Sequence, residues 1–246
     1  SRIAEMLGHS QSRKQKSRRI AELCKFDLQT QMVYEFPELQ GIMGEVYAGF
    51  KGEEPEICRG IREYYLPRTA GDSLPKDPET LPVALADRMD LLAVAFSLQM
   101  IPTGSADPFA LRRTAQGVVQ IVLGLRLSLD WPELAWGAVE ALQKQQESIP
   151  ESGILQEQLV EFLHQRERRY LQDRGFRYDL VEALLSHPEG TPLRRQELAE
   201  ELERELGKAS FKKAVEAVVR AVNISAKYSD ETAKGKLKEA MLQTPE

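Results

Sequence analysis

The sequence has few of the side chains that bind transition metals or act as nucleophiles. Its 246 residues include three histidines, His9, His164 and His187, and two cysteines, Cys24 and Cys58. None of the histidines lies at a ligand-like spacing from another histidine or a cysteine, which argues against a zinc site. Two cysteines cannot form a disulfide framework, so we expect a reducing compartment and no bound metal.

Long apolar runs are also missing. The richest run, residues 91–100, contains Ser97 and Gln99 and falls short of the roughly 20 residues that a transmembrane helix needs. Residues 1–5 lack both a starting Met and the apolar core of a secretory signal, and they resemble the inside of a helix. We therefore expect a soluble, cytoplasmic piece of a longer chain, with no membrane partner.

Motifs for nucleotide hydrolysis and acyl transfer are absent as well. The sequence contains no Gly-x-Ser-x-Gly elbow, and the pair Gly41 and Gly44 lacks the Lys-Ser/Thr continuation of a phosphate-binding loop. Because small residues permit close approach of two helices, we interpret this pair as a packing feature. The net charge is −5, from 33 basic and 38 acidic residues, so any binding to nucleic acid must be local.

The dominant pattern that is present is helical. Apolar residues recur at i, i+3 and i+4, period-two stretches are short, and hairpin dipeptides are missing, which predicts an all-α fold. Asp77-Pro78 and Asp107-Pro108 each place a side-chain acceptor before a proline, a typical helix start. We predict helices near residues 12–35, 38–49, 54–65, 78–100, 111–125, 130–147, 153–173, 177–186, 191–206, 208–226 and 230–242.

The length favours two domains. Pro150 and Gly153 separate two strongly helical segments, whereas the proline-rich loop at 67–78 joins segments that we expect to pack together. We therefore predict a first helical domain at 1–150 and a second at 151–246.

Three basic clusters could contact RNA. The first, residues 12–19, has five positive and no negative residues and is equally compatible with a solvated helix face. The second mixes arginine with aromatic residues, a composition suited to splayed RNA bases, but interleaved acids favour surface ion pairs. Its members are Arg166, Arg168, Arg169, Tyr170, Arg174, Phe176, Arg177 and Tyr178. The third comprises Lys212, Lys213, Arg220, Asn223 and Lys227; its last three residues share one helix face.

Three segments resemble the beta subunit of bacterial heterotetrameric glycyl-tRNA synthetase. They are KFDLQTQMVYEFPELQGIMG at 25–44, ADRMD at 86–90 and PTGSADPFALRR at 102–113. Downstream, residues 166–175 and 221–224 resemble the DALR-type anticodon-binding domain that ends this subunit. The resemblance implies a ligase of protein biosynthesis from a bacterium or an organelle of bacterial descent. In that family the alpha chain carries the aminoacylation site, with its ATP and Mg²⁺, and the beta chain recognises tRNA.

The same resemblance relates the first domain to HD-type phosphohydrolases. Their metal site needs a His-Asp pair, which here reads Phe26-Asp27, and a distal Asp that corresponds to Asp90. Without the histidines we expect this site to be vestigial, although an oxygen-only Mg²⁺ site from the two carboxylates remains an alternative.

These observations lead to a non-catalytic fragment that binds the anticodon region of glycine tRNA. We expect no cofactor in this piece, and as partners glycine tRNA, the alpha subunit and the rest of the beta subunit. The expected tRNA-binding residues are Arg166, Arg168, Arg169, Tyr170, Arg220, Asn223, Lys227, Arg112 and Arg113. The alternatives are an HD-type metal-dependent phosphohydrolase and a module that only bridges subunits.

Overall fold

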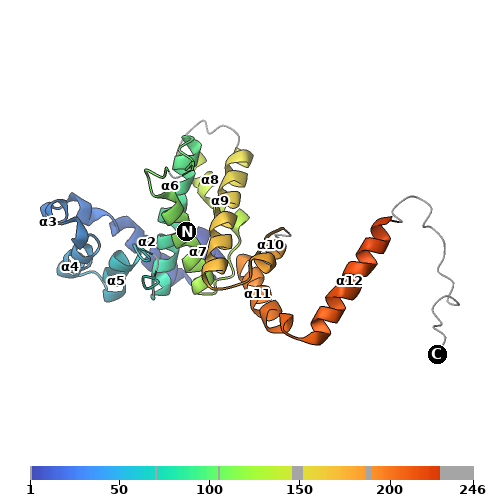
Figure 1. Ribbon diagram of the computed structural model, residues 1–246. Helices are drawn as coiled ribbons and strands as arrows, with labels where there is room; N and C mark the ends of the chain where they lie inside the picture. The colour runs from blue at the N-terminus through green and yellow to red at the C-terminus, as the bar shows by residue number, and fades with distance from the viewer. Residues whose placement is uncertain (1, 70, 105, 146–151, 187–189, 228–246) are drawn as a thin grey trace, which may run out of the picture. The chain divides into compact units, whose positions relative to one another are not determined.

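The computed structural model describes residues 2–69, 71–104, 106–145, 152–186 and 190–227, and these residues form helices joined by turns and loops (Figure 1). The α-helices are α1 (Arg2–Met6), α2 (Gln11–Leu23), α3 (Gln31–Glu35), α4 (Ile42–Phe50), α5 (Pro55–Glu63), α6 (Leu81–Ser97), α7 (Leu111–Gly124), α8 (Trp131–Gln143), α9 (Ser152–Asp173), α10 (Tyr178–Ser186), α11 (Pro192–Leu206) and α12 (Ala209–Lys227). Short 3-10 helices span Phe26–Gln29 (η1), Pro37–Leu39 (η2) and Pro78–Thr80 (η3). The described residues contain no strand, and the all-α prediction is confirmed.

Helices α6, α7, α8 and α9 pack together around the main core (Figure 1). Leu85, Met89 and Leu92 of α6 are almost completely buried in it, as are Val118 and Val122 of α7. Most residues of α6 are buried, and its sequence is accordingly apolar around most of its circumference rather than along one stripe.

Helices α4 and α5 pack closely because glycine stands at their contact. A Cβ atom on Gly44 would lie 2.6 Å from Cγ2 of Ile61 on α5, and one on Gly60 of α5 would lie 2.4 Å from Cδ1 of Ile20 on α2. Gly41 has a φ of +81°, and its Cα faces the Tyr65 ring so closely that a Cβ would lie 2.8 Å away. The packing interpretation of Gly41 and Gly44 is confirmed.

Arg88, in the middle of the ADRMD segment, holds the start of the 67–78 loop. Its guanidinium is buried and donates only to backbone carbonyls, those of Tyr64, Tyr65, Ala84, Leu66 and Pro67. Burial lowers the pKa of Arg88, and a guanidinium remains charged nonetheless. This part of the resemblance to the family is therefore explained by structural support of a loop.

The predicted helix at 12–35 is interrupted in the structure. Thr30 ends one segment and begins the next, because its hydroxyl donates to the Asp27 carbonyl at 2.6 Å and accepts from the Val33 amide at 3.4 Å. The predicted start at Asp107-Pro108 is three residues early. Asp107 accepts the amides of Leu111 and Arg112, at 2.8 and 3.0 Å, so it caps a helix that begins at Leu111.

The division of the chain into compact units falls between Ala199 and Glu200 and does not coincide with the predicted boundary near 150. The reason is the packing of α9, which buries Leu155, Leu159 and Leu163 against the helices that precede residue 150. Pro150 lies outside the described residues. The second unit, Glu200–Glu246, is described as far as residue 227 and comprises the end of α11 and α12. The predicted helix at 230–242 also lies outside the described residues.

Candidate nucleic-acid interface

Most arginines of the second basic cluster are neutralised by nearby carboxylates. Arg168 on α9 binds Glu182 of α10 at 2.7 Å, and Arg169 binds Asp173 one turn further along α9 at 3.0 Å. Arg177 likewise binds Asp179, at 2.6 Å. For these arginines the structure shows the surface ion pairs that their acidic neighbours favour.

Tyr170 is not presented to a ligand. Its side chain is buried, its ring contacts the Arg174 guanidinium at 5.4 Å, and its hydroxyl accepts from Arg174 at 2.9 Å. Because stacking of a base needs an exposed ring face, Tyr170 in this position supports the core of α9 rather than an RNA base. Tyr178 is the exposed aromatic residue of the cluster.

Glu167 stands in the same sequence stretch, but it is completely buried. Its carboxylate accepts from Trp131 Nε1 at 2.7 Å and from Arg195 Nε and Nη2 at 2.8 and 2.9 Å, and His164 Nδ1 lies 3.3 Å away. Burial raises the pKa of Glu167, but the hydrogen bonds from His164, Arg195 and Trp131 outweigh it and the net shift is downward. Sequence reasoning misses this network, because alternating charges on a helix are usually exposed.

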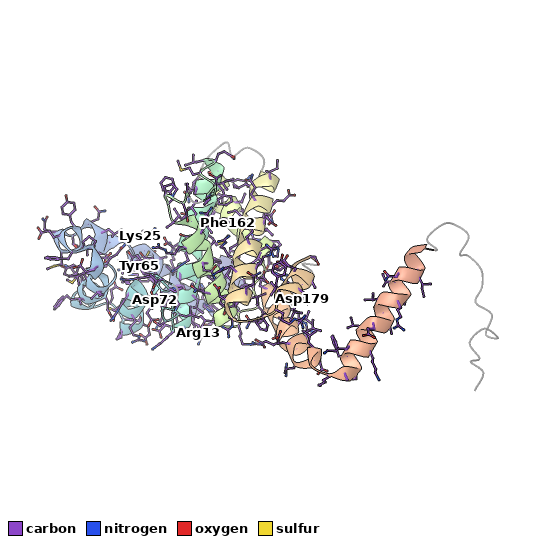
Figure 2. The ribbon with its side chains drawn as sticks, viewed as in Figure 1. Arg13, Lys25, Tyr65, Asp72, Phe162 and Asp179 are labelled. Carbon is purple, nitrogen blue, oxygen red and sulfur yellow. The ribbon has the colours of Figure 1, made fainter. Side chains whose placement is uncertain are left out.

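The structure brings two separately predicted arginines, Arg112 and Arg166, to one cavity of about 510 Å³. We call it the arginine pocket; it lies on unit 1 and is lined by Phe96, Ile101, Pro102, Arg112, Glu157, Gln158, Glu161, Phe162, Gln165 and Arg166. Figure 2 labels Phe162, whose ring lies 5.5 Å from the Arg166 guanidinium. The spacing of the two arginines in sequence gave no indication that they would meet.

Arg166 has no carboxylate within ion-pair distance among the residues that the structure describes. Within the described part of the chain it makes no hydrogen bond or ion pair, and its Nε is buried without a partner. Burial lowers the pKa of Arg166, the positive charge of Arg112 lowers it further, and Asp107 opposes this shift. A buried donor left unpaired costs about 1–3 kcal/mol, so this arrangement is unfavourable unless an acceptor arrives from outside.

Arg112 and Arg113 begin α7 but behave differently. The Arg112 guanidinium donates to the carbonyls of Gly104 at 2.7 Å and Ala106 at 3.4 Å, which fixes it at the rim of the arginine pocket. Arg113 is exposed and has no side-chain partner among the described residues. Both remain available to an anion.

Helix α12, in unit 2, divides its side chains between a basic face and an apolar face. Lys212, Lys213, Arg220 and Asn223 lie on one face and are exposed; Glu216 is the single acid among them. None of the three cations has a carboxylate within ion-pair distance in the described residues. The opposite face carries exposed valines, including Val218 and Val222. Lys227 ends the helix at a position on the same face as Arg220.

The first basic cluster is fully paired. Each of its five cations has a carboxylate partner: Arg13 with Glu79, Lys14 with Glu5, Lys16 with Glu54, Arg18 with Glu22 and Arg19 with Glu53. This cluster therefore offers less uncompensated charge than α12 does.

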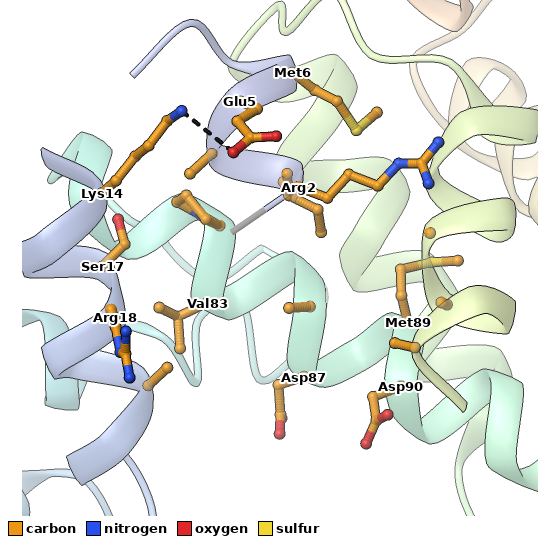
Figure 3. A pocket seen from close by; sticks show the side chains of 18 of the residues that line it. Arg2, Glu5, Met6, Lys14, Ser17, Arg18, Val83, Asp87, Met89 and Asp90 are labelled. Carbon is orange, nitrogen blue, oxygen red and sulfur yellow. Dashed lines mark hydrogen bonds and ion pairs between the residues drawn. The ribbon is translucent and has the colours of Figure 1, made fainter. Parts of the chain in front are cut away.

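The carboxylates that correspond to an HD-type metal site do not converge. Asp27 is completely buried, and its Oδ2 accepts the Gly41 amide at 2.6 Å. Asp90 is exposed and lines a separate cavity of about 1080 Å³ between α1, α2, α6 and α8, shown in Figure 3. No group of three His, Cys, Asp or Glu side chains with metal-binding geometry occurs among the described residues. The residues therefore do not fit the metal site of that class.

The large cavity in Figure 3 is rimmed by charges that already have partners. Lys14 binds Glu5 at 3.4 Å, Lys25 binds Asp87 at 2.5 Å and Arg2 binds Glu140 at 2.6 Å. Its cations therefore leave little uncompensated charge for an anionic ligand. In the described part of the chain, every helix is too short or too polar to cross a bilayer.

Known proteins similar to this chain belong to the family that the three sequence segments resemble. The profile of a family described as glycyl-tRNA synthetase beta subunit matches residues 1–186. The glycine–tRNA ligase beta subunit of Halalkalibacterium halodurans is 48% identical over 226 residues, which are 92% of this chain and 32% of that protein. The same-named protein of Bacillus subtilis is 40% identical over 210 residues, 85% of this chain and 29% of that protein.

A third relative, the glycine–tRNA ligase beta subunit of Moorella thermoacetica, is 47% identical over 169 residues, 68% of this chain and 24% of that protein. The chain thus spans about a third of the length of the curated relatives it matches most extensively. The resemblance seen in the three sequence segments is confirmed, and the chain belongs to the glycyl-tRNA synthetase beta subunit family.

Proposed function

We propose that this chain is the tRNA-recognition part of a glycyl-tRNA synthetase beta subunit. In this proposal it binds the anticodon region of glycine tRNA and so supports glycine attachment by the alpha subunit. The chain itself contributes no catalytic group and no cofactor; ATP and Mg²⁺ act on the alpha subunit. Family membership supports the proposal, as does the distribution of uncompensated positive charge.

The observation that carries the proposal is the basic face of α12. Lys212, Lys213 and Arg220 are exposed without a carboxylate partner among the described residues, whereas Arg168 and Arg169 are paired. Unpaired cations on one helix face attract phosphates because their binding releases condensed counterions from the RNA. In a chain with a net charge of −5, this face is a local exception.

Within this face the residues have different tasks. Lysine is a point charge that positions a phosphate, and Arg220 can bind one through two parallel hydrogen bonds. Asn223 carries both a donor and an acceptor and can therefore read the edge of an unpaired base. Lys227 extends the row by its helix position. Arg113, Arg112 and Arg166 of unit 1 provide further phosphate contacts, and Arg168 and Arg169 contribute only if they leave their carboxylates.

The test is a fluorescence anisotropy titration of the chain with labelled glycine tRNA and with an unrelated tRNA. We expect Arg220→Ala to weaken binding of both tRNAs and to reduce the slope of log affinity against log salt by a little under one unit. Asn223→Ala should cost about 1–3 kcal/mol for glycine tRNA and much less for the other, by analogy with base-edge readout in DNA.

Arg18→Ala is the matched control, because Arg18 is an exposed helix arginine paired with Glu22. It should leave both affinities within about twofold, as expected of a surface ion pair worth less than about 1 kcal/mol. Equal losses from Arg18→Ala and Arg220→Ala would contradict a specific role for α12. Equal losses of both tRNAs from Asn223→Ala would make Asn223 a structural residue.

A further inference from the structure

The arginine pocket combines apolar walls with two arginines. Phe96, Phe162, Ile101 and Pro102 form apolar walls, and the positively charged Arg112 and Arg166 stand beside them. Its volume, about 510 Å³, falls within the range of about 300–1,000 Å³ that is typical of small-molecule sites. The cavity therefore suits a ligand with one flat apolar part and one anionic part.

The positive charge in the pocket is only partly compensated. Arg112 uses two of its donor nitrogens on the carbonyls of Gly104 and Ala106, and Arg166 uses none of its donors on any described residue. Asp107 is occupied by the amides of Leu111 and Arg112. Two guanidinium groups that share a cavity in this way fit a phosphate, whose oxygens can accept from both.

The polar residues of the walls allow recognition of a base. Gln158 has a side-chain amide with no partner among the described residues, so it can both donate to and accept from a base edge. Gln165 donates to Glu161 at 3.2 Å, and this bond holds one of the two acidic residues of the wall. Glu157, the other, is exposed at the rim and limits how much negative charge the site accepts.

We propose that the arginine pocket holds a single unstacked nucleotide of a bound RNA. The phosphate lies between Arg112 and Arg166, and the base lies on the apolar wall formed by Ile101 and Pro102, with its edge toward Gln158. This inference rests on the proposed function in one respect, since it takes RNA as the ligand. It adds a second contact region, on unit 1, whose chemistry differs from the basic face of α12.

An acidic protein segment would satisfy the arginines less completely. A carboxylate could bind Arg166, but it would leave the apolar wall and the Gln158 amide without a use. A nucleotide uses the guanidinium pair, the wall and the amide together. The phosphate contact and the base contact can therefore be tested separately.

The experiment uses the chain as it stands and a 5′-fluorescein-labelled, random-sequence, single-stranded RNA hexamer, followed by fluorescence anisotropy. Arg166→Met keeps the side-chain volume and removes the charge, and we expect it to weaken binding about tenfold because it removes a charge-assisted contact. Arg59→Met is the control, since Arg59 is an exposed arginine of α5 that is already paired with Asp77, at 2.9 Å. Equal affinities of these two variants would overturn the proposal.

Competition separates a nucleotide from other anions. At constant ionic strength, adenosine monophosphate should displace the hexamer from wild-type chain at a concentration at least several-fold lower than inorganic phosphate does. The Ile101→Ala variant should lose this advantage. If phosphate competes as well as adenosine monophosphate, or if tetraglutamate competes better, the pocket does not select a nucleotide and the proposal fails.

Failure of this inference is distinguishable from failure of the proposed function. The double variant Lys212→Ala, Lys213→Ala tests the α12 face with glycine tRNA. In the hexamer titration, it should leave the difference between Arg166→Met and Arg59→Met unchanged. Loss of tRNA binding in that double variant together with equal hexamer binding by the two arginine variants would retain the proposed function and overturn the pocket.

Discussion

Asp27 shows how a residue from a sequence signature can act through one hydrogen bond. Its carboxylate is completely buried and accepts the Gly41 amide at 2.6 Å, while its second oxygen has no partner in the described residues. The bond ties η1 to the turn that begins α4. The family resemblance at 25–44 therefore has a structural explanation that does not require a metal.

Asp27→Ala should destabilise the protein, because it leaves the Gly41 amide unpaired in the interior. We expect a loss of about 1–3 kcal/mol in the free energy of unfolding, measured by urea denaturation. Asp90→Ala, at the exposed position that corresponds to the distal HD ligand, should change it by less than about 0.5 kcal/mol. A stoichiometric manganese or magnesium ion that both variants lose would show instead that the two carboxylates cooperate.

Glu167 should make stability depend on acid. Burial raises its pKa, but the hydrogen bonds it accepts outweigh burial and lower the pKa below the unfolded value of about 4.3. Its contribution is then fully present above that value and is lost as the pH falls through the lower pKa of the folded state. The unfolding free energy of wild type should therefore fall below about pH 4.3, more steeply than that of Glu167→Gln.

At neutral pH, Glu167→Gln should cost about 3–5 kcal/mol, because it removes one charge of a buried ion pair that Glu167 forms with Arg195. Glu182→Gln removes the partner of Arg168 at a half-exposed site and should cost less than about 1 kcal/mol. Chemical denaturation at pH 7 measures both. Similar losses in the two variants would mean that burial of the network has little energetic consequence.

At the scale of single residues, the sequence predicts ion pairs on the surface far better than buried ion pairs. The spacing of Arg169 and Asp173 is enough to expect an ion pair, and the pair is present. Glu167 and Arg195 form an ion pair, and Arg112 and Arg166 line one cavity, although in each case the two residues lie on helices that are distant in sequence. Local spacing contains no information on such contacts.

At the scale of elements, glycine determines how closely α4 and α5 approach. Gly44→Ala would place a Cβ 2.6 Å from Ile61 and should destabilise the protein by about 1–3 kcal/mol through overpacking. Gly49→Ala, on the same helix, has no atom within 4 Å of its new Cβ and should stabilise by up to about 1 kcal/mol through helix propensity. Thermal and urea unfolding of the Gly44→Ala and Gly49→Ala variants would measure both changes in stability.

Rescue would identify the contact that causes the loss. Ile61→Leu removes the Cγ2 methyl group that the new Cβ would meet, keeps the side-chain volume, and should recover part of the stability that Gly44→Ala loses. No recovery in the double variant would place the strain elsewhere along the helix.

The sequence predicts which segments are helical, but it predicts less accurately where each helix begins and ends. From α8 to α12 the predicted limits agree with the structure to within one or two residues at most ends, because apolar periodicity is strong there. Within residues 12–39 the helix ends cannot be predicted from apolar spacing. There the Thr30 cap and the Asp27 bond stop one helix and start the next, and such side-chain bonds to backbone do not disturb the apolar spacing.

For the whole molecule, α9 determines which part of the chain folds as one unit. A chain that ends at residue 150 would lose six buried hydrophobic side chains of α9: Leu155, Leu159, Phe162, Leu163, Tyr170 and Leu171. Their burial is worth at least about 9 kcal/mol, which is comparable to the whole stability of a domain. We expect that truncated chain to unfold without a cooperative transition.

A chain that ends at residue 207 retains all of unit 1. Its melting temperature should lie within about 4 °C of the full chain, the shift that roughly 1 kcal/mol produces in a protein of this size. Calorimetry of the two truncated chains measures both results. A cooperative transition in the chain that ends at 150 would restore the boundary that Pro150 and Gly153 indicate.

The Glu167 network also places one of the protein's two tryptophans in a spectroscopically useful position. Trp131 is completely buried and donates to the carboxylate that binds Arg195 of α11, whereas Trp136 is partly exposed. Emission from Trp131 should therefore be blue-shifted and protected from iodide, and Trp136 should supply the quenchable fraction. In a Trp136→Phe variant, the emission maximum of Trp131 would report in real time whether α11 is packed against the core, without any attached dye.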